Sequence, residues 1–224
     1  MTRPGELTAV LFDMDGLLVD TEPLWLRAEI ATMAALGSTW SQADQHAIMG
    51  GTLEHAAQHL RRVSGSDLPE SAIADLLVGH MLDDLRTREI PLQPGAADLL
   101  ADVAAAGIPL ALVSASVGPI VDVVLSALAA AGVPGFPVAV TGDDVERGKP
   151  DPQPYLRAAD LLGIDIRGAV VLEDSPSGVR SGRAAGATVV AVPHAVPIDP
   201  GPGIHLRDSL VELTLADLRA LVTD

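Results

Sequence analysis

The sequence predicts an α/β protein in which a Rossmann-like parallel sheet carries an inserted, all-helical cap. Four short runs of Val, Ile and Leu have the continuous apolar character of strands that are buried on both faces. Helical patterns separate the later runs, as expected for a parallel sheet covered by helices. About 95 residues separate the first run from the second, which is too long for one crossover helix. An insertion after the first strand is the simplest explanation.

The core elements follow in chain order. The apolar runs predict strands at 7–12, 108–113, 169–172 and 188–192, with a weaker strand at 137–140. The spacing of apolar residues predicts helices at 95–106, 117–131, 152–162 and 176–185. The Pro- and Gly-rich stretch 193–208 is expected to be a loop, and 214–222 a final amphipathic helix.

The insert is expected to be helical throughout. Apolar spacing and the glycines that follow it predict helices at 22–36, 41–49, 52–63 and 69–88. The chain enters this block near Asp20 and Thr21 and leaves it at 91–94, so these two segments are expected to form a two-stranded connection. We therefore expect an α/β core made of residues 1–20 and 91–224, and a helical cap made of residues 21–90.

The composition narrows the classes of partner. A net charge of −16 leaves no basic stripe for nucleic acid. No apolar run approaches the ~20 residues of a membrane span, and the first six residues lack the pattern of a signal peptide. The absence of cysteine excludes disulfides, thiolate metal sites and cysteine nucleophiles. We expect a cytoplasmic protein, monomeric by default, that binds neither nucleic acid nor membrane.

The first apolar run ends in two aspartates, Asp13 and Asp15, followed by Gly16. Residues i and i+2 of an extended chain point the same way, so both carboxylates can reach one reaction centre. Buried carboxylates are costly unless they are compensated, and carboxylate oxygens suit a hard cation such as Mg²⁺. The alternative is a plain strand followed by an Asp-Gly turn.

Polar residues also follow the other predicted strands. Ser114 follows the second strand, Glu173 and Asp174 follow a later one, and Lys149, the only lysine in the chain, precedes a helix. Ligands of open α/β sheets bind just beyond the carboxyl ends of the strands, where these side chains are expected to meet. Each alone could instead be a helix cap, a turn residue or a surface lysine. Their combination favours one site.

Taken in order, these residues resemble the four motifs of the haloacid dehalogenase-like hydrolase superfamily over nearly the whole chain. Within it, the chain resembles the branch that contains β-phosphoglucomutase and small sugar-phosphate phosphatases. The first motif and the residues after it are most similar to bacterial hexitol and 2-deoxyglucose-6-phosphate phosphatases. The motifs are Asp13-Met14-Asp15-Gly16, Ser114, Gly148-Lys149-Pro150-Asp151-Pro152 and Glu173-Asp174-Ser175-Pro176-Ser177-Gly178.

The resemblance implies a Mg²⁺-dependent phosphatase that acts on a small phosphorylated metabolite. Asp13 would be the nucleophile that forms an aspartyl-phosphate. Asp15 would protonate the leaving alcohol and then activate water. Mg²⁺ would be held by the Asp13 carboxylate, the Asp15 backbone carbonyl and Asp174, with Glu173 either a direct ligand or a neighbour of one.

The resemblance also assigns the groups that hold the phosphoryl oxygens. Ser114 and Lys149 would contact them, and backbone N–H groups that follow Asp15 and Ser114, at Gly16 and Ala115, would contribute. Lys149 would offset repulsion between the nucleophile and the incoming dianion. Closure of the cap would exclude bulk water and select the substrate.

Residues of the expected cap carry the specificity. Glu22 and Trp25 follow the first motif and are candidates to line the substrate pocket. The alternative for Trp25 is that it packs in the core of the cap. Arg27, Glu54 and His55 are further possible contributors. His55 and His59 are spaced i, i+4, which permits a metal pair, but without an evident third ligand a solvated helix face is favoured.

Two alternatives to hydrolysis have different signatures. A phosphomutase keeps the same four motifs and returns the phosphoryl group to a sugar. Trp25, Met49 and Leu53 stand where β-phosphoglucomutase has a histidine, a lysine and an arginine, so a second phosphate would lack its charged partners here. A catalytically silent regulatory protein is disfavoured because all four motifs are intact. The resemblance therefore favours a sugar or polyol phosphatase.

Overall fold

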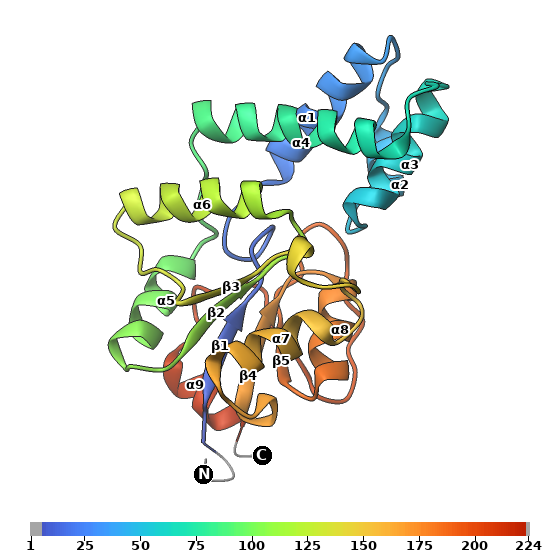
Figure 1. The fold of residues 1–224 in the computed structure, drawn as a ribbon. Coiled ribbons are helices and arrows are strands. Elements are labelled where there is room, and N and C mark those ends of the chain that lie inside the picture. The colour runs from blue at the N-terminus through green and yellow to red at the C-terminus, as the bar shows by residue number, and fades with distance from the viewer. Residues whose placement is uncertain (1–5, 223–224) are drawn as a thin grey trace.

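The computed structural model describes residues 6–222, and the parallel sheet that the sequence predicts lies at its centre (Figure 1). Six parallel strands run in the order β3-β2-β1-β4-β5-β6. The strands are β1 (Ala9–Phe12), β2 (Leu110–Val113), β3 (Val138–Val140), β4 (Ala169–Glu173), β5 (Thr188–Ala191) and β6 (Ile204–Leu206). The expectation of no leader sequence rests on residues 1–6, of which 1–5 lie outside the described part.

Helices cover both faces of the sheet. They are α5 (Ala96–Ala105), α6 (Gly118–Ala130), α7 (Gln153–Leu162), α8 (Pro176–Ala185) and α9 (Leu215–Leu221), with short 3₁₀ turns at η1 (Gly142–Asp144) and η2 (Ile166–Gly168). Alternate residues of β1 face opposite layers: Val10 and Phe12 pack in one apolar cluster, and Ala9 and Leu11 in the other. This two-sided burial explains why the strands are apolar without alternation.

The four predicted helices of the insert pack together above the sheet (Figure 1). They are α1 (Glu22–Ala35), α2 (Gln42–Ile48), α3 (Leu53–Ser64) and α4 (Glu70–Thr87), and we call them the cap helices. Ser41 caps α2 in a reciprocal pair with Asp44, and Thr52 caps α3. Helix α4 also packs on α6, which joins the cap helices to the helical layer of the core.

The segments that lead into and out of the cap helices lie side by side. Asp20 N–H donates to the carbonyl of Pro91 at 2.8 Å, and Gln93 N–H donates to that of Leu18 at 3.0 Å. Between them, Val19 and Leu92 face each other in an antiparallel bridge. The expected pairing of these segments is present, whereas the division into two domains stays a prediction.

One expected loop contains a strand. Within the stretch 193–208, Ile204–Leu206 forms β6 and adds a parallel edge to β5. The strand is only three residues long, is not fully buried and holds His205 at its centre, so it lacks the apolar run that identified the others. Among the described residues, no helix combines the length and the apolar character needed to cross a lipid bilayer.

Candidate active site

The polar residues of the four motifs meet beyond the carboxyl ends of β1, β2 and β4, facing the cap helices. Asp13 follows β1, Ser114 follows β2, and Asp174 follows β4. Lys149 reaches the same place from the connection between β3 and α7, and its Nζ donates to Asp13, which follows β1, and to Glu173, which ends β4. The topology thus assembles residues that are up to 161 positions apart in the sequence, from Asp13 to Asp174.

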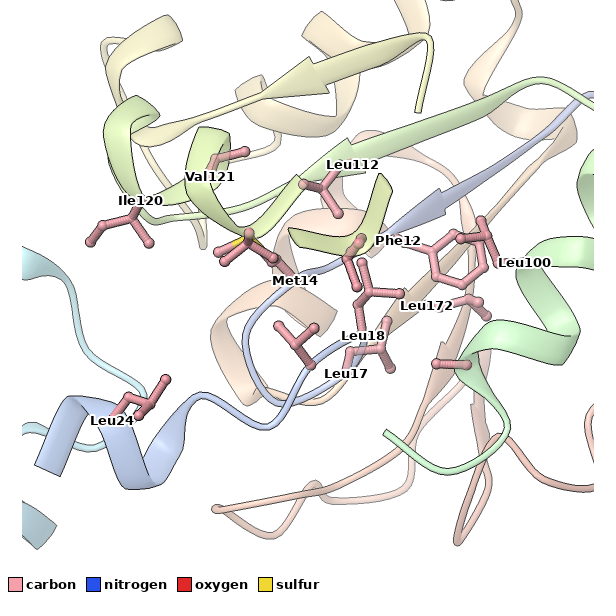
Figure 2. Close-up of a cluster of buried hydrophobic side chains, with 14 of the residues drawn as sticks. Phe12, Met14, Leu17, Leu18, Leu24, Leu100, Leu112, Ile120, Val121 and Leu172 are labelled. Atoms are coloured by element: carbon pink, nitrogen blue, oxygen red, sulfur yellow. The ribbon is translucent and has the colours of Figure 1, made fainter. Parts of the chain in front are cut away.

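The turn after β1 is fixed by apolar side chains that point away from the site. Met14, Leu17 and Leu18 are buried in the cluster that also contains Phe12 (Figure 2). The backbone closes on itself because Gly16 N–H donates to the Val19 carbonyl at 2.8 Å. Burial of these side chains therefore holds the two aspartates that lie between them.

Gly16 is required by conformation and by space. Its φ of +85° lies in the left-handed region, which side chains disfavour. A Cβ added there would lie 2.3 Å from Oδ2 of Asp174. Any larger residue would displace the acid that follows β4, so the glycine of the first motif serves the geometry of the last.

Lys149 is the central cation of the site. Its Nζ donates to Oδ1 of Asp13, to Oε1 of Glu173 at 2.6 Å and to the carbonyl of Val113 at 2.8 Å. Burial alone would lower the pKa of Lys149, but the two carboxylates raise it well above its usual value. Burial raises the pKa of Asp13 to about 8 against the opposing charge of Lys149. The ion pairs thus compensate a set of charges that the protein interior would otherwise reject.

Glu173 is fully buried, and both of its oxygens are occupied. Oε1 accepts from Lys149 and from the Tyr155 hydroxyl at 2.9 Å. Oε2 accepts from the backbone N–H groups of Asp174 and Ser175 and from the Ser175 hydroxyl, at 3.0–3.1 Å. A Cβ on Gly178 would lie 1.6 Å from Oε1, so the last motif needs glycine where α8 passes this carboxylate.

Asp15 accepts hydrogen bonds from two directions. Its Oδ1 accepts from the Thr21 hydroxyl at 2.6 Å and from the Trp25 indole at 3.3 Å, both at the start of α1. Its Oδ2 accepts from the hydroxyls of Ser116 at 2.8 Å and Ser114 at 3.2 Å, both beyond β2. Asp15 therefore joins the sheet side of the site to the first cap helix.

The acids of the site fit a divalent cation. Asp13, Glu173 and Asp174 can each present an oxygen with all three atoms within 4.8 Å of one another. Among the described residues, nothing donates a hydrogen bond to the carboxylate of Asp174, although its side chain is almost buried. Burial, followed by repulsion from Asp13 and Glu173, raises the pKa of Asp174 well above its usual value. A buried acid without a donor is costly, and a hard cation would supply the missing partner.

A cavity opens above these residues and extends to the cap helices. Asp13, Asp15, Lys149 and Asp174 form its floor. Helix α1 contributes one wall, and the connection between α2 and α3 contributes another. The site is thus a closed-in chamber between the sheet and the cap helices, with acids and one ammonium group at its base. The cap-side lining residues are Glu22, Trp25, Glu29, Gln45, Ile48, Met49, Gly50, Gly51, Thr52, Leu53, Ala56 and Leu77.

Comparison with known proteins identifies this arrangement. Residues 10–192 match the family described as haloacid dehalogenase-like hydrolase. The chain belongs to that family. The match spans the first motif, the cap helices and the last motif, so it confirms the family and the hydrolase class that the motifs predict, and the Rossmann-like α/β fold with them.

Relatives of this hydrolase are similar over almost the full length. Hexitol phosphatase B of Escherichia coli strain K12 is 33% identical, with 97% of this chain and 99% of the relative covered. A crystal structure of a mutant CbbY from Rhodobacter sphaeroides in complex with xylulose-(1,5)bisphosphate is 31% identical, with a TM-score of 0.84 and 95% and 99% of the two chains covered. The β-phosphoglucomutase of Clostridium difficile, at 18% identity, 96% and 97% coverage and a TM-score of 0.80, shares the fold. The family match and the hexitol phosphatase relative support a hydrolase of the phosphatase type.

The structure brings most of the predicted site residues to one place, but three of them, Gly16, Ser114 and the fully buried Glu173, do not line the cavity. Ser114 is buried behind the cavity wall and donates to Asp15, while Ala115 and Ser116 line the chamber. Gly16 lies beneath Asp174 rather than on the wall. Glu22 and Trp25 line the cavity as expected.

Other predicted contributors lie elsewhere. Arg27 pairs with Asp84 at 2.7 Å on the surface of the cap helices. Glu54 and His55 are exposed, and neither is among the residues that line the cavity. His59 is not on a solvated face: it is buried, with Nε2 3.0 Å from Asp44 Oδ1. The exposed-face interpretation of His59 is therefore wrong, because a residue from α2 covers it.

The sequence analysis assigned no role in the site to four residues that the structure places there, namely Thr21, Ser116, Tyr155 and Glu29. Tyr155 lies one turn into a predicted helix, and only the fold brings its hydroxyl to Glu173. Its ring also lies 5.1 Å from Lys149 Nζ. Glu29 offered one signal: it shares a helical face with Glu22 and Trp25, at spacings of three and four residues.

Proposed function

We propose that this hydrolase is a Mg²⁺-dependent phosphatase of sugar or polyol phosphates that works through an aspartyl-phosphate. The observation that carries the proposal is the floor of the cavity. Asp13 is held there by Lys149 through one oxygen, its other oxygen is free of hydrogen bonds among the described residues, and Asp174 beside it lacks any donor. This is the arrangement expected for a nucleophile next to a cation site.

In the first half-reaction, the free oxygen of Asp13 attacks the phosphorus of the substrate. A bond forms between Asp13 and phosphorus, and the bond to the ester oxygen breaks. The departing oxygen takes a proton from Asp15 and leaves as the alcohol. The hydroxyl and indole donors around Asp15 orient its carboxyl group for this transfer.

In the second half-reaction, Asp15 removes a proton from water as the water oxygen attacks the phosphorus. The bond between phosphorus and Asp13 breaks, which releases inorganic phosphate and restores both acids. Lys149 keeps Asp13 in place throughout and offsets the charge that gathers on the phosphoryl oxygens. Asp13 and Asp174 would hold Mg²⁺, which would supply further positive charge to the phosphoryl group.

The proposed role of Glu173 is to position Lys149 rather than to bind the cation directly. Both of its carboxylate oxygens already accept hydrogen bonds, from Lys149 and Tyr155 at Oε1 and from Asp174 and Ser175 at Oε2. Ser114 would act in a comparable way, since its hydroxyl orients Asp15 at 3.2 Å. Ser116 and the backbone at Ala115, which line the cavity, are better placed to contact phosphoryl oxygens.

The substrate class rests on the relatives and on the cap side of the cavity. A relative that covers nearly the whole chain is named hexitol phosphatase. Among the described residues that line the cavity, the single cation is Lys149, and it lies at the floor. A substrate with one phosphate and an uncharged body fits this distribution better than the bisphosphate bound by the CbbY neighbour.

The test is Mg²⁺-dependent phosphate release from p-nitrophenyl phosphate and from a hexitol 6-phosphate. Asp13→Asn is expected to abolish both activities, because the amide is a poor nucleophile. Asp122→Asn, which changes an exposed acid on α6, is the matched control and is expected to keep full activity. Undiminished turnover in Asp13→Asn, or turnover unaffected by a chelator, would overturn the proposal. Efficient transfer of phosphate to a sugar in place of water would reassign the enzyme as a mutase.

A further inference from the structure

The face of α1 that looks into the cavity carries three polar residues in a row. Glu22, Trp25 and Glu29 all line the chamber, and their spacing places them along one side of the helix. The Trp25 indole donates to Asp15 at 3.3 Å, which ties the start of this row to the reacting end of the site. Glu29 lies one helical turn further away, a rise of about 6 Å. It therefore faces the part of a substrate that is remote from the phosphate.

Glu29 is held by one oxygen and leaves the other available. Its Oε2 accepts from the Trp40 indole at 3.1 Å. Within the described residues, Oε1 accepts no hydrogen bond and no cation pairs with the carboxylate, although only 7% of the residue is exposed. A buried acid with half its capacity unused costs stability, whereas an apolar residue would fill the same space without that cost. Packing alone does not account for glutamate here.

The partner of Glu29 is itself held in place. The Trp40 ring meets the His59 ring edge-on, with centroids 5.7 Å apart. His59 lies 3.0 Å from Asp44 through Nε2 and accepts from Arg62 through Nδ1 at 2.8 Å. The indole N–H is thus fixed toward Oε2 of Glu29, and Glu29 lines the cavity with Oε1 free of hydrogen bonds within the described residues. This is a built polar site and not a mobile surface acid.

The surroundings of Glu29 determine what it can bind. The cap-side lining within the described chain consists of Glu22, Gln45, Thr52, Trp25 and apolar or glycine residues, with no lysine or arginine. The side-chain amide of Gln45 also makes no hydrogen bond in the described part of the chain. A second phosphate would meet two acids and no counter-charge there. A hydroxyl group can donate to a carboxylate and accept from an amide.

We propose that Glu29, oriented by Trp40, is a specificity-determining residue that hydrogen-bonds a hydroxyl remote from the phosphate and excludes substrates with a second anionic group. The inference rests on the proposed phosphatase function, and it adds what Glu29 recognises in the part of the substrate that does not react. The ligand class is an uncharged polyhydroxy chain or ring that bears a single phosphate. Burial raises the pKa of Glu29 to about 7, and in either protonation state its carboxyl group can bond a hydroxyl.

The decisive experiment compares two substrates in each variant. Glu29→Leu removes the hydrogen bond and is expected to lower kcat/KM for a hexitol 6-phosphate by about 10- to 100-fold, because a polar substrate group is left unpaired. Hydrolysis of p-nitrophenyl phosphate, which has no hydroxyl group, is expected to change less than about threefold. Glu54→Leu, at an exposed position on α3, is the matched control and is expected to leave both values unchanged.

Two further variants keep the test decisive if Glu29→Leu folds poorly. Glu29→Gln keeps the shape and the Trp40 contact but removes the charge that Glu29 carries above its raised pKa of about 7. At about pH 8, turnover of fructose 1,6-bisphosphate relative to hexitol 6-phosphate is therefore expected to rise by about tenfold. Trp40→Phe frees the carboxylate and is expected to raise KM for the hexitol phosphate alone. Equal changes for both substrates in Glu29→Leu, or an unchanged ratio in Glu29→Gln, would overturn the inference. If the unaltered enzyme hydrolyses neither substrate, that result would instead count against the proposed function.

Discussion

The floor and the cap-side wall of the cavity both carry buried acids, but the two regions treat them in opposite ways. On the floor, Asp13 shares the ammonium group of Lys149 with Glu173, which lies next to the floor but does not line the cavity, and short hydrogen bonds fix both acids. On the wall, Glu29 has a neutral indole as its single hydrogen-bond partner among the described residues. In the function that we propose, the compensated charges of the floor act on phosphorus, whereas the free oxygen of Glu29 on the wall binds the rest of the substrate. The proposal therefore places chemistry and substrate selection in different elements.

The largest effect is expected on the floor, from Lys149→Met. The variant leaves two carboxylates buried without their cation, which costs about 3–5 kcal/mol of unfolding free energy. The rate of hydrolysis is expected to fall by about a hundred- to a thousandfold. Urea unfolding and steady-state kinetics measure the two losses. A variant with the stability of the parent would show that Lys149 does not compensate these acids.

Gly16→Ala is expected to displace Asp174 on the floor of the cavity by steric collision. Alanine pays about 1–2 kcal/mol for the left-handed conformation, and its Cβ collides with Asp174. Gly37→Ala is the matched control, since Gly37 has a φ of +74° and open space around its Cβ position. Both variants are expected to lose stability, but only Gly16→Ala is expected to weaken Mg²⁺ activation. Equal Mg²⁺ dependence in the two variants would separate Gly16 from the cation site.

On the cap-side wall, Glu29 is expected to make the stability of the folded protein depend on pH. The folded protein keeps the proton of Glu29 up to about pH 7, while the unfolded chain releases it near the usual value of 4.5. Stability from this residue is therefore lost as the pH rises through that window. Glu29→Gln removes the loss and is expected to gain about 1–3 kcal/mol over the parent between pH 4 and pH 8. Urea titrations at both pH values test this, and a pH-independent difference contradicts it.

The smallest effect is expected where the two regions meet, at Thr21. Thr21→Val removes the hydroxyl that donates to Asp15 at 2.6 Å but keeps the size and branching of the side chain. Three donors to Asp15 remain, so kcat is expected to fall by about tenfold or less, equivalent to about 1 kcal/mol. Thr87→Val on the exposed end of α4 is the control. A loss as large as that of Lys149→Met would mean that Thr21 has a role beyond orientation.

The difference between the floor and the wall also explains which parts of the fold and of the site could be predicted from the sequence. Strands such as β1 and β4 and the acids that follow them leave a local signal, because a fully apolar run that ends in a carboxylate is costly without a reason. Ser116 and Tyr155 do not, since their partners at Asp15 and Glu173 lie far away in the chain. β6 was missed because an edge strand of three half-exposed residues needs no apolar run. Glu29 became visible only when the fold showed which face of α1 lines the cavity.

The close pairing of Val19 and Leu92 has a consequence for how such enzymes can diversify. The two points at which the chain leaves and rejoins the sheet side lie next to each other, joined by two backbone hydrogen bonds that any residue other than proline can make at the donor position. A different helical segment with equally close ends could replace residues 21–90 without moving the strands. Transplanting this segment from a relative that has a threonine and a tryptophan at the positions of Thr21 and Trp25 is therefore expected to change substrate preference and to keep the donors that hold Asp15.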